Sequence, residues 1–244
     1  MGDFKTIVID CLRHGCCEGP QQTLRGRTDV ALTREGRLAM LETAGRVGTP
    51  DRVITSPLRR CLEAAETLAT QWRTRPLVLD EIREMDFGDW DGVPTETLLT
   101  HDRDRLERFQ QDPSEQTPPG GERYDAFLSR TASGWQALLR CGLEVSQRES
   151  GDKRSPDVAH LLVCGHAGVI KSWAAASLGL STVGAQHLYK LHLPYAGLMR
   201  FRVDIHGHSG ERYEQLRFAG VPDTPCALMS RPMTLFLYRY LLCG

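Results

Sequence analysis

The sequence predicts an α/β fold, a three-layer sandwich with a mainly parallel central sheet and helices on both faces. Short apolar runs rich in β-branched residues alternate along the chain with longer segments whose apolar residues recur three or four positions apart. The composition agrees, because 244 residues with 41% hydrophobic and 25% charged side chains are enough for one domain with a well-filled core. A disordered chain and a small disulfide scaffold are therefore excluded.

The first half of the chain alternates predicted strands with predicted helices. In order, they are a strand at 5–12, a helix from Thr33, a strand at 52–55, a helix from 56 and a strand at 77–79. Thr33 has the hydroxyl of an N-cap, and its helix carries an apolar stripe of Leu38, Leu41, Ala44 and Val47. Ser56 and Pro57 predict the start of the second helix, with Ser as N-cap and Pro at the first helical position.

The second half continues the alternation. In order, it contains a short helix near 95–110, a loop at 118–121, a long amphipathic helix at 124–139, a polar loop at 146–157, a strand at 160–164, a helix at 170–178 and a last strand at 197–205. The strand at 160–164 has the uniformly apolar character of a central strand.

Charged and imidazole side chains follow three of these strands. Arg13 and His14 come after the first strand, and His166 comes after the strand at 160–164. The second strand is followed by Ser56, Arg59 and Arg60. Ligands of α/β sheets bind at the carboxyl ends of the strands. The sequence therefore predicts one site at that edge, with two imidazoles and at least two guanidinium groups.

The overall charge limits the classes of partner. Lys and Arg total 30 against 31 Asp and Glu, a net charge of −1, which is unlike a nucleic-acid or anionic-membrane binder. Arg accounts for 26 of the 30 basic residues, so local recognition of an anion stays open. No apolar run is long enough to span a membrane, no signal peptide is visible, and the eight Cys residues form no C-x-x-C pair. These features predict a reduced, cytoplasmic protein.

Five motifs resemble the histidine phosphatase superfamily, which includes the cofactor-dependent phosphoglycerate mutases. In family order they are LRHG at 12–15, GRTDVALTREG at 26–36, SPLRR at 56–60, EMDFGDWDG at 84–92 and GHAGVI at 165–170. The resemblance implies a phosphoglycerate mutase-like fold and phosphatase activity. The segment around Glu84 and the stretch at 120–122 are most similar to α-ribazole phosphatases of cobalamin synthesis. Phosphoglycerate mutases usually carry a longer insertion after the acid segment, so the resemblance favours a phosphatase.

The resemblance also implies a role for each predicted catalytic residue. His14 is the nucleophile, and Arg13, Arg60 and His166 bind the phosphoryl oxygens. Glu84 is the general acid that protonates the leaving oxygen, although Asp86, Asp89 and Asp91 are alternatives beside it. The expected substrate-binding set also contains the backbone N–H of Ala167 and the residues Cys17, Thr28 and Glu122. For Glu122, an ion pair within its loop is the alternative role. The scheme needs no metal ion and no cofactor.

The chain departs from the family pattern in two places. Cys16 and Cys17 stand where the family usually has Glu or Gln and then Ser or Thr, and a thiol is a weaker donor to phosphate than a hydroxyl. A zinc site at these residues lacks a visible second ligand pair, whereas a redox-sensitive thiol stays open. The second departure is an apolar extension at 221–244, beyond a catalytic domain at 1–220. This extension could form a docking strand, a contact in a homodimer or a segment of limited order.

The sequence thus predicts a phosphomonoester hydrolase that acts on a small phosphorylated metabolite, with α-ribazole 5′-phosphate as the leading candidate. A phosphoglycerate mutase or a broad sugar-phosphate phosphatase on the same site is one alternative. A non-catalytic phosphate-ligand sensor is another, if Cys16 and Cys17 have disabled the site. No nucleic acid and no membrane is expected as a partner.

Overall fold

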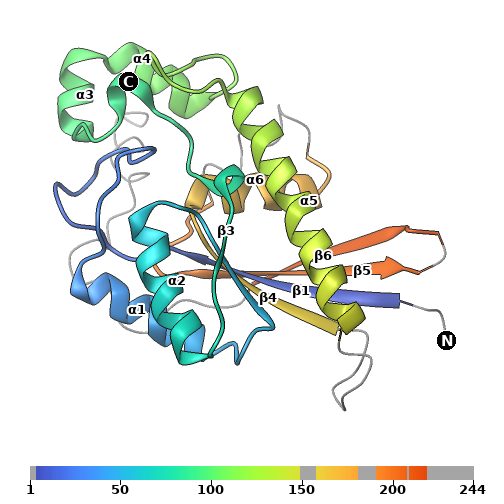
Figure 1. Cartoon of the computed structure of the whole chain (residues 1–244). Coiled ribbons are helices and arrows are strands. Elements are labelled where there is room, and N and C mark those ends of the chain that lie inside the picture. The colour runs from blue at the N-terminus through green and yellow to red at the C-terminus, as the bar shows by residue number, and fades with distance from the viewer. Residues whose placement is uncertain (1–3, 149–157, 181–190, 208, 219–244) are drawn as a thin grey trace.

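A six-stranded sheet forms the centre of the computed structural model, which describes residues 4–148, 158–180, 191–207 and 209–218 (Figure 1). The strand order is β3-β2-β4-β1-β5-β6. The strands are β1 (Phe4–Arg13), β2 (Arg52–Thr55), β3 (Leu77–Val78), β4 (Val158–Gly165), β5 (Leu198–His206) and β6 (Arg212–Phe218).

The first four strands run parallel, whereas β5 and β6 run antiparallel to their neighbours. In the register, Arg13 at the end of β1 pairs with Gly165 at the end of β4, and Thr55 at the end of β2 pairs with Cys164. The carboxyl ends of β1, β2 and β4 therefore lie side by side at one edge of the sheet. This is the arrangement that the predicted site requires.

Helices cover both faces of the sheet, as predicted. They are α1 (Arg34–Gly45), α2 (Arg59–Gln71), α3 (Thr95–His101), α4 (Arg103–Gln111), α5 (Tyr124–Arg148) and α6 (Ala167–Ser177), with short 3₁₀ turns at Asp80–Ile82 and Gly88–Trp90. Side chains of α5 and α6 share one buried cluster with Ile7, Ile9 and Cys11 of β1. Side chains of α1 and α2 share a second cluster with Leu12. Because successive strand residues point to opposite faces, the buried β1 serves both clusters.

Several local predictions are confirmed. The predicted strand at 52–55 coincides with β2, and the strands at 5–12 and 160–164 lie within β1 and β4. Thr33 is the N-cap of α1, and its hydroxyl oxygen accepts a hydrogen bond from the Gly36 N–H at 2.9 Å. These signals depend on residues close in the sequence, so few distant contacts compete with them.

The apolar stripe predicted for α1 is wrong in part. Leu38 is 54% exposed, whereas Gly36, Met40, Thr43 and Ala44 are buried. Gly36 packs so closely on the backbone of Cys16 that an added Cβ would lie 2.2 Å from the Cys16 carbonyl oxygen. This close approach turns the Gly36 side of α1 inward and leaves Leu38 outside.

The predicted start of α2 is also wrong. The helix begins at Arg59, with Leu58 as N-cap. The Ser56 hydroxyl lies 2.8 Å from Nε2 of His166, so Ser56 belongs to the strand-end site. Asp29, from the loop before α1, accepts the Arg59 N–H at 2.7 Å and so supplies the capping oxygen.

The remaining differences concern segment ends and one strand. The helix predicted near 95–110 is two helices, α3 and α4, and α5 continues through Arg148 into the predicted polar loop. The edge strand β6 was not predicted, because its sequence RYEQLRF is polar and reaches the sheet only through the hairpin with β5. The extension predicted at 221–244 lies outside the described residues. Among the described helices, none combines the length and apolar character needed to cross a bilayer.

Candidate active site

The predicted strand-end residues meet at one edge of the sheet. The His14 N–H donates to the Gly165 carbonyl at 2.9 Å, and the Ser56 N–H donates to the Cys164 carbonyl at 3.1 Å. The rings of His14 and His166 lie with their centroids 5.4 Å apart. Parallel pairing of β1, β4 and β2 thus brings together residues that are far apart in the sequence.

His14 is buried, and its two ring nitrogens have different environments. Nδ1 lies 2.9 Å from the Gly15 carbonyl oxygen, which can only accept, so Nδ1 carries the proton of the neutral ring. Nε2 is then left with its lone pair. Burial lowers the pKa of His14 well below its ordinary value, and the charges of Arg60 and Arg13 lower it further. The imidazole is therefore neutral near pH 7, as a nucleophile must be.

Arg60 is a fully buried cation held by carbonyl oxygens. It donates to the carbonyls of Thr28 at 2.8 Å, Gly26 at 2.7 Å and Arg25 at 3.1 Å, while its Nε has no partner. Within the described part of the chain, no carboxylate lies within ion-pair distance of Arg60. A buried charge without a counter-ion is costly, so this guanidinium is prepared for an anion.

The loop that holds Arg60 is itself anchored by Asp91. The Asp91 carboxylate accepts the backbone N–H groups of Gly26 and Thr28, each at 3.1 Å, and the Thr28 hydroxyl proton. Thr28, which the sequence assigned to substrate binding, therefore directs its hydroxyl to Asp91 and its carbonyl to Arg60. Its observed contacts are those of a residue that positions Arg60.

Arg13 is the second cation without a carboxylate partner among the described residues. Its guanidinium donates to the Leu193 carbonyl and lies 4.1 Å above the centroid of the Tyr195 ring, while its buried Nε has no hydrogen-bond partner. Stacking on Tyr195 stabilises the cation without neutralising it. Arg13 thus keeps its charge for an external anion.

His166 is the N-cap of α6 and is fully buried. Its Nε2 lies 2.8 Å from the Ser56 hydroxyl. Burial lowers its pKa well below the ordinary value, and Arg60 and His14 lower it further. Ala167 is the first residue of α6, and its N–H is among those that a helix leaves without an internal acceptor. The predicted donors His166 and Ala167 are therefore adjacent at one helix start.

Glu84 is the acidic residue of its segment that contacts this helix start. Its Oε2 accepts the Gly168 N–H at 3.0 Å, and its Oε1 accepts the Met85 N–H at 3.0 Å. The neighbouring carboxylates have other partners, since Asp86 pairs with Arg27 at 3.1 Å and Asp91 anchors the Arg60 loop. Gly168 permits the approach, because an added Cβ there would lie 2.3 Å from Glu84 Oε1.

Cys17 contacts the nucleophile. Its Sγ is fully buried and lies 3.5 Å from both Nδ1 of His14 and the Gly15 carbonyl oxygen. Burial raises the pKa of this thiol, which favours the protonated and less reactive form. The observed contact is on the Nδ1 side of the ring, away from the lone pair of Nε2.

Two other predicted positions carry ion pairs. Glu122 pairs with Arg130 at 2.7 Å, the loop interaction that the sequence offered as its alternative role. Arg59, adjacent to Arg60, is exposed and pairs with Glu63 at 3.0 Å. The two neighbouring arginines thus have opposite environments, and the buried one is Arg60, the residue that the motif resemblance assigned to phosphate.

The sequence did not single out Tyr195 or Lys171. Tyr195 approaches His14 to a ring centroid distance of 5.5 Å, and no local pattern marked it. Burial, followed by the charge of Arg13, lowers the pKa of Lys171 to about 8. Lys171 is four residues after Ala167 on α6, so helical spacing from the second His motif was the available signal.

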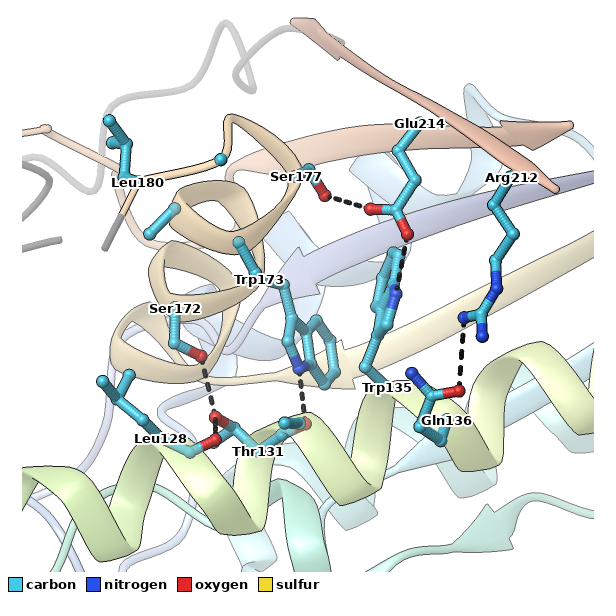
Figure 2. A pocket seen from close by; sticks show the side chains of 14 residues that line it. Leu128, Thr131, Trp135, Gln136, Ser172, Trp173, Ser177, Leu180, Arg212 and Glu214 are labelled. Atoms are coloured by element: carbon cyan, nitrogen blue, oxygen red, sulfur yellow. Dashed lines mark hydrogen bonds between the residues drawn. The ribbon is translucent and has the colours of Figure 1, made fainter. Parts of the chain in front are cut away.

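A cavity of about 610 Å³ lies elsewhere, between α5, α6 and β6 (Figure 2). Trp135 and Trp173 line it together with polar groups such as Glu214, and its lining includes none of the predicted site residues. In the described ranges, no group of three or more His, Cys, Asp or Glu side chains is arranged to hold a metal ion.

Comparison with known proteins identifies related sequences and folds. The model of the histidine phosphatase superfamily (branch 1) matches residues 9–215. A bifunctional protein of Mycobacterium tuberculosis is 32% identical over 191 residues, covering 77% of this chain and 48% of that protein. The glucosyl-3-phosphoglycerate phosphatase of Mycobacterium tuberculosis is 28% identical over 172 residues, covering 69% and 74%. The adenosylcobalamin/α-ribazole phosphatase of Salmonella typhi is 26% identical over 196 residues, covering 79% and 84%.

The fold is similar to that of solved structures. A solved structure of a mycobacterial glucosyl-3-phosphoglycerate phosphatase superposes with a TM-score of 0.68 at 23% identity, covering 88% of this chain and 98% of that one. The chain spans about half the length of the first of the curated relatives, 48% of the bifunctional protein.

Proposed function

The chain belongs to the histidine phosphatase superfamily, and from this membership we propose that it hydrolyses phosphomonoesters through a phosphohistidine on His14, without a metal ion. The substrate in this proposal is a small phosphorylated metabolite. One observation carries it: a neutral, buried imidazole with a lone pair on Nε2 lies in a site with two arginines that have no carboxylate partner among the described residues. This combination supplies a nucleophile and fixed positive charge for a phosphoryl group.

In the first step, Nε2 of His14 attacks phosphorus, and the bond from phosphorus to the leaving oxygen breaks. Arg13, Arg60, His166 and the Ala167 N–H bind the phosphoryl oxygens as their charge is redistributed. The leaving oxygen takes a proton from Glu84. The Nδ1–H of His14 keeps its hydrogen bond to the Gly15 carbonyl, which stabilises the positive charge that the ring acquires.

In the second step, water attacks the phosphohistidine. Glu84, now a carboxylate, accepts the proton from the attacking water, and the bond between phosphorus and Nε2 breaks. Its electron pair returns to the imidazole, and inorganic phosphate leaves. The enzyme then has its starting protonation states, with Glu84 protonated and His14 neutral.

For the substrate, α-ribazole 5′-phosphate is the leading candidate. The motif resemblance and the 26% identity to an α-ribazole phosphatase support it. The glucosyl-3-phosphoglycerate phosphatase, at 28% identity, favours a phosphorylated sugar acid as the rival substrate. Both candidates are phosphomonoesters with an alkyl leaving oxygen, so both need the proton from Glu84.

The test of activity is turnover of p-nitrophenyl phosphate by the purified chain in the presence of EDTA. We expect turnover that His14→Ala abolishes and that His101→Ala, a control at an exposed position on α3, leaves unchanged. An alkaline quench during turnover should leave the phosphoryl group on the peptide that contains His14. Absence of turnover, or turnover that survives His14→Ala, would defeat the enzymatic proposal, and phosphate binding without turnover would favour the sensor.

The test of the substrate is a screen of phosphorylated metabolites. It should include α-ribazole 5′-phosphate, glucosyl-3-phosphoglycerate and 3-phosphoglycerate, with release of inorganic phosphate as the readout. The highest kcat/KM is expected for α-ribazole 5′-phosphate, and a low value beside the sugar phosphates would contradict this assignment. Conversion of 3-phosphoglycerate into its 2-phosphate isomer without phosphate release would indicate a mutase.

A further inference from the structure

Arg130 is half-buried and makes a set of contacts around the segment that carries Glu84. It lies on α5 and donates to the carbonyl oxygens of Glu81 at 2.9 Å, Arg83 at 2.9 Å and Glu84 at 3.3 Å. It also donates two hydrogen bonds to the Glu122 carboxylate, at 3.0 and 2.7 Å. One side chain thus uses its planar fork to hold three backbone groups of the acid segment.

Glu122 holds the same segment from its other end. Its carboxylate accepts the Asp86 N–H at 3.3 Å, and its own N–H donates to the Asp86 carbonyl at 2.9 Å. Arg130 thus binds carbonyls up to that of Glu84, and Glu122 binds the backbone of Asp86, two residues further on. The ion pair therefore restrains the backbone on both sides of the predicted general acid.

Helix α5 also fixes the element that Glu84 faces. The Ser172 hydroxyl donates to the Thr131 hydroxyl at 3.0 Å, and the Trp173 indole N–H donates to the Thr131 carbonyl at 2.8 Å (Figure 2). Thr131 follows Arg130 on α5, while Ser172 and Trp173 belong to α6. The same turn of α5 therefore connects the backbone of Glu84 with the helix whose Gly168 N–H binds the Glu84 carboxylate.

We infer that Arg130 is a positioning residue for the general acid: with Glu122, it holds Glu84 where its proton reaches the leaving oxygen. The inference rests on the proposed function, in which Glu84 protonates that oxygen. A general acid acts only within hydrogen-bond reach of its target, and displacement by about 1 Å can cost on the order of 100-fold in rate. Arg130 acts through Glu84 and has no contact with the substrate in this scheme.

The test separates positioning of the acid from general stabilisation by means of two leaving groups. The phenolate of p-nitrophenyl phosphate leaves without protonation, whereas the alkoxide of an alkyl phosphate such as β-glycerophosphate needs the proton. Hydrolysis of the phosphohistidine is common to both substrates, so the readout is kcat/KM, which reports only the steps up to departure of the leaving group. For Arg130→Met, we expect kcat/KM to fall by about 100-fold for the alkyl phosphate and by less than about 3-fold for p-nitrophenyl phosphate. Equal losses for the two substrates, or no loss for either, would overturn the inference.

Two further variants complete the comparison. Arg123→Met is the matched control, since Arg123 immediately precedes α5, is exposed and forms its ion pair with the exposed Asp125. It should leave kcat/KM unchanged for both substrates.

Arg130→Lys keeps the charge beside Glu122 without the planar fork, so it keeps the inference testable if Arg130→Met does not fold. We expect the same selective loss for the alkyl phosphate, and full recovery of its kcat/KM would contradict the positioning role.

Glu84→Gln distinguishes failure of this inference from failure of the proposed function. If the wild-type chain is inactive, or if His14→Ala remains active, the proposed function fails. If Glu84→Gln shows the selective loss and Arg130→Met does not, only the inference about Arg130 is refuted. If Glu84→Gln shows no selective loss, the acid assignment is refuted and the inference falls with it.

Discussion

Replacing Gly168 by Ala tests whether the approach of Glu84 to α6 matters for activity. A Cβ at position 168 would lie 2.3 Å from Glu84 Oε1, and ordinary van der Waals contact begins at 3.4 Å. The carboxylate must therefore move by about 1.1 Å, and the movement breaks or lengthens its hydrogen bond from the Gly168 N–H. The backbone can stay in place, because the closest atom is the end of a flexible side chain.

The displacement predicts a defined loss of activity. A misplacement of about 1 Å can cost on the order of 100-fold in rate, which corresponds to roughly 2.7 kcal/mol in the activation free energy. The free energy of unfolding should change little, since Ala is favoured over Gly by up to about 1 kcal/mol in a helix. This gain offsets part of the loss of the hydrogen bond between Glu84 and the Gly168 N–H. The variant should thus be folded but slow.

The assay compares kcat/KM for β-glycerophosphate and p-nitrophenyl phosphate, which excludes the shared hydrolysis of the phosphohistidine, together with the melting temperature. We expect Gly168→Ala to lower kcat/KM for the alkyl phosphate much more than kcat/KM for p-nitrophenyl phosphate. Gly45→Ala is the control, because an added Cβ at Gly45, the last residue of α1, has no heavy atom within 4 Å. Full activity of Gly168→Ala toward the alkyl phosphate would refute the assignment of Glu84 as the acid at this helix start.

Three other predictions follow from the site and the sheet. Arg60→Met should lower kcat/KM for p-nitrophenyl phosphate by at least about 100-fold, whereas the exposed Arg59→Met should change it by less than about 2-fold; equal effects would contradict the distinction. His14 and His166 have pKa values held below those of the unfolded chain, so lowering the pH from about 7 to 5 protonates the unfolded state first. Urea unfolding should show stability falling by about 1 kcal/mol per pH unit for each histidine, and a flat profile in wild type would be the contrary result. Asp10→Asn replaces a fully buried carboxylate that binds an arginine and a histidine. It should lower the free energy of unfolding by roughly 2–4 kcal/mol without changing kcat/KM. A loss of kcat/KM in the folded variant would argue against a purely structural role.

Prediction from sequence succeeded where the signal is local. The β-branched run of β1, the buried run of β4 and the Thr33 cap each depend on neighbours within a few residues. The parallel alternation then implied that the ends of β1, β2 and β4 share an edge, and the register agrees. The position of the candidate site followed from this topology.

Prediction failed where a distant group changes a local preference. Ser56 has the side chain of an N-cap, yet its hydroxyl lies beside His166, and the cap of α2 comes from Asp29. Leu38 fits an apolar stripe, but the contact between Gly36 and the Cys16 backbone decides which side of α1 faces inward. Such contacts join residues that are between 20 and more than 100 positions apart, so no short window contains them.

The sequence by itself determined the family, the fold class and the edge of the sheet where the reactive side chains gather. Motif order and hydrophobic periodicity depend only on the order of residues along the chain. Only the tertiary structure decided which groups hold those side chains in place. Asp91 anchors the loop whose carbonyls bind Arg60, and Arg130 binds the segment of Glu84. These roles depend on hydrogen bonds whose directions exist only after the sheet and helices have packed, and that is the physical reason why a pattern of residue types does not reveal them.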